Sequence, residues 1–308
     1  MPMIDPLAIL AGSRVTTPLV PITLPEYGVP VWCKLEFLNP SGSTKDRIAR
    51  YILSKAVRSG RLKPGDRVVE ASSGSTSIAF ALASAQLGLS FTAIMPESVS
   101  PERVKIIKAY GAKVELTPAD EGIDASIKLA EKLAAEQDAF WPQQFSNPDN
   151  AKAHRDETAA EVLCQIPSGY VDIFVSGVGT GGTLVGVTQG LLSAGCDVVP
   201  VLARPVSNKL ISDVECCSFS KRIPGVVDGL SDIFQEAQLQ KLIEFEISDE
   251  DAIVATRRLI QAGFPVGPSS GLNYLAAVRA YKERGGTPVC LTVFPDRMER
   301  YFSTDLFQ

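Results

Sequence analysis

The sequence predicts an α/β protein in which two domains each contain a mostly parallel, twisted sheet. Short β-rich runs alternate with longer stretches of helical periodicity along the chain, which is typical of βαβ units. The 308 residues, 45% of them hydrophobic, are enough for two well-buried cores. No low-complexity stretch or internal repeat interrupts the alternation in the sequence.

In the first half of the chain, strands are expected at residues 67–70, 91–95 and 113–117. Small polar residues after the first strand predict a turn into a buried helix at 76–87. A second helix is expected from Ser100, as its N-cap, to the closing Gly111, with Pro101 at its first position.

In the second half, strands are expected at residues 171–175, 198–203 and 289–294. Helices are expected to begin near Thr183, after Ser248 and at Leu272. Ser248 and Asp251 resemble a capping box, which favours a helix start at that point.

We place the domain boundary near residue 147, so that residues 1–147 form an N-terminal α/β domain and residues 148–308 a C-terminal one. The first strands of the chain are compatible with pairing in the sheet of the other domain. A ligand is expected between the domains, at the carboxyl ends of the strands.

Composition excludes several classes of partner. The net charge of −5 leaves no basic surplus for a nucleic acid or an anionic membrane, which favours a small-molecule ligand. The N-terminus lacks the basic region of a secretory signal, and His154 is the only histidine, so we expect no metal site. The six cysteines contain no C-x-x-C pair, which favours reduced thiols and a cytoplasmic protein; they are Cys33, Cys164, Cys196, Cys216, Cys217 and Cys290.

A glycine-rich segment, SGVGTGGT, runs from Ser176 to Thr183 between an expected strand and an expected helix. Its four glycines allow backbone N–H groups to turn toward an anion at the helix N-terminus, which predicts a phosphate site. The spacing matches neither the dinucleotide fingerprint nor a P-loop. An ordinary strand-to-helix turn is the alternative.

Lys45 lies in a turn-rich segment, NPSGSTKDR, at the start of another expected helix. The helix dipole disfavours a cation there. Taken alone, such a lysine is more often a solvated surface residue. With a phosphate site elsewhere in the chain, it becomes a candidate for a Schiff base, because the amine must be partly deprotonated to condense with an aldehyde.

A second small-residue turn, SSGST, runs from Ser72 to Thr76. Its hydroxyls and backbone N–H groups suit a substrate carboxylate, with plain N-capping as the alternative. Ser269, followed by Ser270 and Gly271, is equally ambiguous alone.

Together these segments resemble the cysteine synthase family, the fold type II pyridoxal-phosphate enzymes that include O-acetylserine sulfhydrylases and cystathionine β-synthases. The similarity covers nearly the whole chain and rests on TPLV at Thr17, KLEFLNPSGSTKDR around Lys45, QFSNPDN at Gln144, SGVGTGGTLVGV at Ser176, SSG at Ser269 and DRMERYFST near the end.

The resemblance implies pyridoxal 5'-phosphate as cofactor and a role for each matched residue. Lys45 matches the lysine that binds the cofactor and later carries the Cα proton. Ser269 matches the partner of the pyridine nitrogen, and Ser75 stands beside the phenolic oxygen. The matched phosphate loop comprises Gly179, Thr180, Gly181, Gly182 and Thr183. The matched substrate-carboxylate residues are Ser72, Ser73, Gly74, Thr76 and Gln144.

The implied reaction is a β-replacement on an activated L-serine. A neutral serine at the ring nitrogen makes the cofactor a milder electron sink than an aspartate would, which favours elimination of a good leaving group. The implied order is transaldimination, Cα deprotonation by Lys45, loss of the leaving group, addition of a nucleophile at Cβ and reprotonation.

Three positions depart from the family pattern, and each affects substrate selection more than cofactor chemistry. Ser75 replaces the usual asparagine of T-S-G-N-T-G. Pro224 to Gly229 replaces the usual G-I-G-A-G-F loop. Met298 stands where the family's G-[DE]-R-Y has glycine.

We therefore expect a cysteine synthase that converts O-acetylserine and sulfide to cysteine, with no nucleic acid or membrane partner. A homodimer is implied by the resemblance alone. Alternatives are the use of O-phosphoserine, or a side-branch reaction in which an amine, thiosulfate or another thiol attacks. A dehydratase is disfavoured because its S-S-G-N-H loop is absent. A catalytically inactive member that acts as a binding partner is disfavoured by Lys45 and the intact glycine loop.

Overall fold

The computed structural model describes residues 6–206 and 231–308. Its strands are β1 Leu19–Ile22, β2 Val31–Lys34, β3 Arg67–Ala71, β4 Ser90–Pro96, β5 Lys113–Thr117, β6 Ile173–Ser176, β7 Val199–Val206, β8 Ile243–Ser248 and β9 Cys290–Val293. They form a three-stranded sheet in the order β3-β4-β5 and a six-stranded sheet in the order β1-β2-β9-β6-β7-β8. All pairs are parallel except β1 with β2. The predicted α/β fold with mostly parallel sheets is confirmed.

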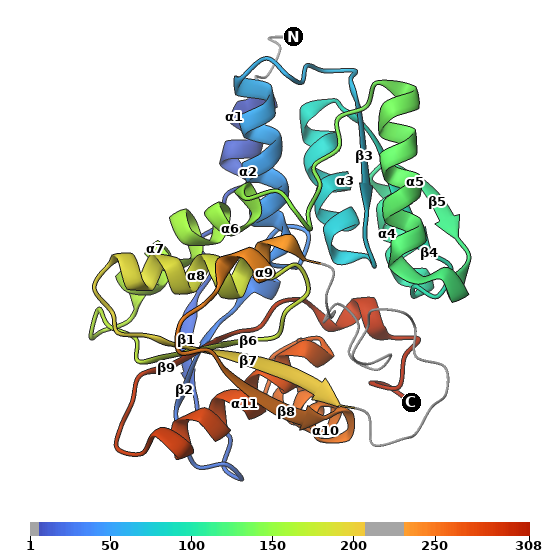
Figure 1. Ribbon diagram of the computed structural model, residues 1–308. Coiled ribbons are helices and arrows are strands. Elements are labelled where there is room, and N and C mark those ends of the chain that lie inside the picture. The colour runs from blue at the N-terminus through green and yellow to red at the C-terminus, as the bar shows by residue number, and fades with distance from the viewer. Residues whose placement is uncertain (1–5, 207–230) are drawn as a thin grey trace.

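Helices cover both sheets (Figure 1). The α-helices are α1 Pro6–Gly12, α2 Lys45–Arg58, α3 Ser75–Leu87, α4 Pro101–Ala109, α5 Gly122–Gln137, α6 Asp149–Ala153, α7 Ala160–Gln165, α8 Gly182–Ser193, α9 Asp232–Ala237, α10 Asp249–Gln261 and α11 Pro268–Arg284. Short 3-10 helices lie at Glu36–Leu38, Ala119–Glu121 and Met298–Tyr301, and a π-helix lies at His154–Ala159. Among the described residues, no helix is both long enough and apolar enough to span a bilayer.

The first two strands of the chain belong to the six-stranded sheet. Trp32 of β2 is the register partner of Leu291 of β9, near the other end of the chain. The chain therefore begins in one sheet, forms the three-stranded sheet and returns. The boundary at residue 147 remains a prediction.

The three-stranded sheet is covered on both faces, because successive side chains of a strand point in opposite directions. Val68 packs with α2 and α3, whereas its neighbour Val69 packs against α5. Both valines are buried, as expected for a parallel strand that is covered on both faces.

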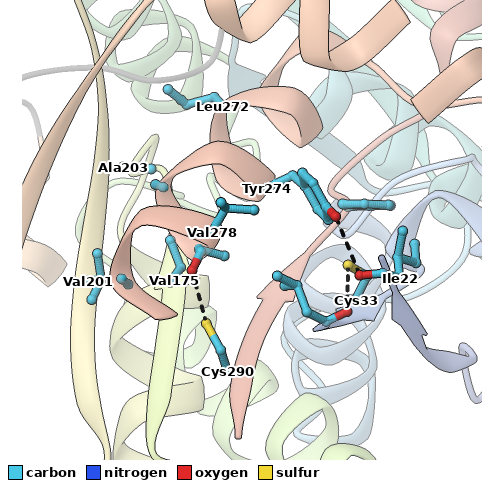
Figure 2. Packing of buried hydrophobic residues seen from close by; sticks show 14 of the residues in the cluster. Ile22, Cys33, Val175, Val201, Ala203, Leu272, Tyr274, Val278 and Cys290 are labelled. Carbon is cyan, nitrogen blue, oxygen red and sulfur yellow. Dashed lines mark hydrogen bonds between the residues drawn. The ribbon is translucent and has the colours of Figure 1, made fainter. Parts of the chain in front are cut away.

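The six-stranded sheet has α10 and α11 on one face and α8 on the other. Figure 2 shows α11 lying against the sheet, with Tyr274 and Val278 directed into the core. The Tyr274 hydroxyl lies 3.0 Å from the backbone nitrogen of Leu24, from which it accepts a hydrogen bond. This core fixes the first turn of α11, which carries Ser269.

One predicted helix start needs correction. The last helix begins at Pro268 rather than Leu272; proline suits the first position of a helix because the N–H of that residue needs no intrahelical partner. Ser269 therefore lies inside the helix. Ser100 is the N-cap residue of α4 and Pro101 its first residue, as predicted, although the Ser100 hydroxyl makes no cap hydrogen bond and donates instead to the carbonyl of Arg300 at 2.8 Å. The Ser248 cap is confirmed, since its oxygen accepts from the Asp251 N–H at 3.1 Å.

Candidate active site

The backbone of the segment before Lys45 is hydrogen-bonded to residues near the C-terminus. The Thr44 N–H donates to the carbonyl of Pro295 at 2.8 Å, and the Arg300 guanidinium donates to the carbonyls of Ser41 and Gly42. Helix α2 then begins at Lys45, as the sequence predicted. The lysine is thereby held at a fixed helix terminus.

The surroundings of Lys45 favour its neutral amine. Burial lowers the pKa of Lys45, and the negative charges of Asp296 and Glu36 only partly oppose this effect. A lysine with a lowered pKa is a better nucleophile toward an aldehyde at neutral pH.

The predicted carboxylate loop connects β3 to α3. The Ser72 hydroxyl accepts from the N–H groups of Gly74 and Ser77, both at 3.1 Å, so it shapes the turn from inside. Gly74 has a φ of 144°, and a Cβ there would come within 2.3 Å of Cδ of Arg103. Glycine is thus required at the centre of this loop.

Gln144 and Thr76 are brought together, as their shared predicted role requires. The Thr76 hydroxyl donates to Oε1 of Gln144 at 2.7 Å, and Nε2 of Gln144 donates to the carbonyl of Ala71 at 2.5 Å. Gln144 is 2% exposed. In this structure its side chain therefore supports the loop from within.

Glu70 is a site-adjacent residue that sequence reasoning missed. Its buried carboxylate accepts hydrogen bonds from the N–H of Ala71 at 2.9 Å, the N–H of Gln144 at 3.1 Å and Nε1 of Trp141 at 3.3 Å. Burial raises the pKa of Glu70 to about 7, although these donors oppose the shift. The sequence offered one indication of it, an acidic residue two positions before the first serine of the SSGST turn.

The glycine-rich loop leads from β6 into α8. Gly181 has a φ of +78° and precedes the first helical residue, Gly182. Among the described residues, none accepts a hydrogen bond from the backbone N–H of Gly179, Thr180 or Gly181. Free backbone donors at a helix N-terminus suit a phosphate.

Two residues outside the predicted set hold this loop. Nδ2 of Asn150 donates to the Thr180 hydroxyl at 2.9 Å and to the carbonyl of Gln144 at 2.8 Å, which joins the glycine loop to the carboxylate loop. His154 lies 3.3 Å from the Thr183 hydroxyl, measured at Nε2. Burial lowers the pKa of His154 to about 3, so its ring is neutral.

The C-terminal region also reaches Ser75 and the neighbourhood of Ser269. The Ser75 hydroxyl lies 3.2 Å from Oδ2 of Asp296, to which it donates, and the N–H of Gly267 donates to the Asp296 carbonyl at 2.9 Å. Within the described ranges, no hydrogen bond joins the Lys45 side chain to residues 179–183. The loop at Pro224 to Gly229 lies outside the described residues.

A family model described as pyridoxal-phosphate dependent enzyme matches residues 11–296. The chain belongs to this family. The resemblance drawn from the motifs is thus confirmed, as are the enzyme class and the cofactor.

Individual members of the family are similar over almost the full length. Cysteine synthase B of Campylobacter jejuni is 40% identical over 290 residues, which cover 93% of this chain and 94% of that protein. The crystal structure of an O-ureido-L-serine synthase has a TM-score of 0.85 and 34% identity, covering 97% of this chain and 94% of that one. An O-acetylserine-dependent cystathionine β-synthase from Helicobacter pylori has a TM-score of 0.86 and 29% identity, covering 97% and 98%.

The residues present fit the family's cofactor. The free N–H groups at 179–181 suit its phosphate, and the lowered pKa of Lys45 suits its aldehyde. The buried hydroxyls of Thr44, which precedes Lys45, and of Ser270, which follows Ser269, have no hydrogen-bond partner in the described part of the chain. Such groups are expected where a polar ligand binds.

Proposed function

We propose that the protein catalyses a pyridoxal-phosphate-dependent β-replacement on an activated L-serine, most simply the conversion of O-acetylserine and sulfide to cysteine and acetate. The observation that carries the proposal is Lys45, a lysine with a lowered pKa at the start of α2, in a chain of this family. The similarity to a cysteine synthase and to an O-acetylserine-dependent enzyme supports the choice of reaction and donor.

Each proposed role follows from the chemistry of the residue. When bound, the cofactor acts as the electron sink that stabilises charge at the substrate Cα. Lys45 holds the cofactor and moves the proton of Cα. By the family resemblance, Ser269 would hydrogen-bond the pyridine nitrogen and Ser75 would lie beside the ring oxygen. The phosphate is held by Gly179, Thr180, Gly181, Gly182 and Thr183.

The substrate carboxylate is assigned to the loop after β3. Its proposed contacts are Ser72, Ser73, Gly74, Thr76 and Gln144. Because Thr76 and Gln144 are hydrogen-bonded to each other, binding of a carboxylate must either use their remaining capacity or exchange that bond.

A second reaction of the same type is favoured by one observation. Ser75 replaces an amide with a shorter hydroxyl, and the chain is 34% identical to an O-ureido-L-serine synthase of TM-score 0.85. O-phosphoserine as donor, or an amine, thiosulfate or another thiol as acceptor, is therefore the alternative. Donors crossed against acceptors, with products identified by mass, distinguish these reactions.

We also propose that the protein is a cytoplasmic homodimer with an N-terminal domain of residues 1–147 and a C-terminal domain of residues 148–308. The absence of a C-x-x-C pair from the sequence supports the compartment, and the family resemblance supports the dimer.

The first prediction concerns Lys45. Borohydride reduction of the yellow holoenzyme, followed by peptide mapping, should place the cofactor on Lys45, and Lys45→Ala should abolish turnover because it removes both the tether and the proton carrier. The control is Lys55→Ala on the same helix, whose ammonium pairs with Asp149 at 2.6 Å and which should keep activity. A label on another lysine would refute the assignment.

A further inference from the structure

Residues 295–301, here called the C-terminal connecting segment, contact three of the four segments around which the active site is proposed, namely those near Lys45, Ser75 and Ser269. Its first residue accepts from the N–H of Thr44 at 2.8 Å, beside Lys45. Its second, Asp296, accepts from the Ser75 hydroxyl at 3.2 Å and, through its carbonyl, from the N–H of Gly267 at 2.9 Å. Asp296 is the point at which these contacts meet.

The carboxylate of Asp296 is buried and held by hydroxyls. The residue is 5% exposed, and Oδ2 accepts from the Tyr301 hydroxyl at 2.7 Å as well as from Ser75. No ion pair of Asp296 occurs within the described ranges, where Oδ1 also lacks a hydrogen-bond partner. Hydrogen bonds to a charged acceptor are stronger than neutral ones, so the Asp296 carboxylate should fix the orientation of the Ser75 and Tyr301 hydroxyls.

One of the two anions that act on Lys45 belongs to the C-terminal connecting segment. Asp296 and Glu36 are the anions that oppose the effect of burial and raise the lysine pKa. His154, which also interacts with Lys45, is neutral because burial keeps its pKa near 3. Asp296 therefore has an electrostatic link to the lysine in addition to its bond to Ser75.

The C-terminal connecting segment also contacts the loop after β3 through Arg103. The guanidinium of Arg103 lies 5.0 Å from the centre of the Tyr301 ring, and its Nη1 donates to the carbonyl of Ser73 at 3.0 Å. The Arg103 side chain also occupies the space beside Gly74. Tyr301 is thus linked to the loop after β3 in two ways, through Asp296 to Ser75 and through Arg103 to Ser73.

The direction of the bond decides what Ser75 offers to a ligand. A serine has one hydroxyl proton, and this one is directed to Asp296, so only the lone pairs of the oxygen remain available. An asparagine at this position would present an amide N–H.

We propose that Asp296 is a positioning residue for the proposed reaction, holding the Ser75 hydroxyl as a hydrogen-bond acceptor toward the bound amino acid. The inference rests on the proposed function, because it assumes an amino-acid substrate beside the carboxylate loop. Tyr301 orients Asp296, and Asp296 acts through Ser75.

The test measures binding of L-serine to the holoenzyme through the absorbance of the bound cofactor. Tyr301→Phe keeps the ring under Arg103 and removes only the hydroxyl; we expect it to raise the Kd about fivefold, as does Asp296→Ala. Asp296→Asn should recover part of the affinity, since its amide oxygen still accepts from both hydroxyls. The matched control is Tyr170→Phe, whose hydroxyl accepts from the N–H of Asp197 at 2.8 Å, and it should leave the Kd unchanged.

A double-mutant cycle separates positioning from general support of the fold. If Asp296 acts through Ser75, then Ser75→Ala should raise the Kd in the parent but add almost nothing in the Asp296→Ala background. The affinity for pyridoxal phosphate should stay within about twofold in the Tyr301 and Asp296 variants. Additive effects of the two substitutions on the Kd, or an unchanged Kd in Tyr301→Phe, would refute the positioning role of Asp296 and leave the proposed function intact. A parent holoenzyme that binds no L-serine would refute both the positioning role and the proposed function.

Discussion

At the scale of single residues, Gly181 shows that a glycine in a predicted binding loop can be required by the protein itself. Its φ is +78°, and a Cβ there would lie 2.7 Å from Cβ of Phe234. A Cβ at Gly182 would lie 1.9 Å from Oδ1 of Asn150. The sequence predicted glycines for the approach of a phosphate, whereas their spatial neighbours also exclude a side chain.

The second prediction follows from this packing. Gly181→Ala should lower the free energy of unfolding by about 2–4 kcal/mol, the sum of a left-handed backbone and an overpacked contact. Gly195→Ala is the matched control, because its φ is +88° and no atom lies within 4 Å of the added Cβ. It should show the backbone cost alone, about 1–2 kcal/mol. Urea unfolding of both variants checks this, and equal losses would show that Phe234 gives way.

At the scale of elements, local patterns predicted most of the βαβ units and misplaced those ends that distant residues decide. The strand expected at 113–117 is β5, and the helix expected at 76–87 is α3 with one further residue. Ser100 occupies the N-cap position of α4, but its hydroxyl makes no cap hydrogen bond and donates instead to the carbonyl of Arg300, which lies 200 positions away. No local pattern contains that partner.

The same limit applies to the candidate site. Its loops could be found from glycine, serine and lysine in strand-to-helix turns, because those residue types have local physical reasons to be there. Glu70, Asn150 and Asp296 escaped notice, since each acts through residues far along the chain. Their importance depends on which loops the fold brings together.

Glu70 makes the end of β3 sensitive to pH. The raised pKa, about 7, means that the folded state retains the proton up to that pH, while the unfolded chain releases it near 4.5. Stability from Glu70 is therefore complete below about pH 4.5 and is lost as pH rises through about 7. The loss amounts to roughly 3 kcal/mol.

The third prediction compares Glu70→Gln with the parent at pH 5 and pH 8. Because the amide does not titrate, the parent should lose roughly 3 kcal/mol of unfolding free energy relative to the variant between these pH values. The control is Glu115→Gln, on the exposed face of β5, whose unfolding free energy should differ from that of the parent by the same amount at both pH values. A constant difference between Glu70→Gln and the parent would show that the carboxyl titrates normally.

At the scale of the whole molecule, a buried ion network joins the six-stranded sheet to the helix that carries Lys45. Arg47 of α2 donates to Glu36 at 2.7 Å and to both oxygens of Glu161 at 2.8 Å. Lys34 of β2 lies 2.8 Å from Oε2 of Glu161, measured at Nζ. Although burial raises the pKa of Glu36, the charge and hydrogen bonds of Arg47 outweigh it and lower the pKa to about 2. The network thus connects the six-stranded sheet to α2 two residues from the proposed catalytic lysine.

The last prediction is that Arg47→Met destabilises the protein by about 3–5 kcal/mol in urea unfolding at pH 7, because it leaves the buried carboxylate of Glu36 without its cation and removes one of the two cations of Glu161. The matched control is Arg58→Met, an exposed arginine on the same helix, which should stay within about 0.5 kcal/mol of the parent. Stability from Glu36 is present above about pH 4.5 and is lost as pH falls through about 2, so the deficit of Arg47→Met should shrink over that range. Adding Glu36→Gln to Arg47→Met should recover part of the loss, since the uncompensated charge is removed with its cation already gone. If the double variant is instead less stable than Arg47→Met, the cost lies in lost packing around the side chains, and the network joins the six-stranded sheet to α2 by shape rather than by charge.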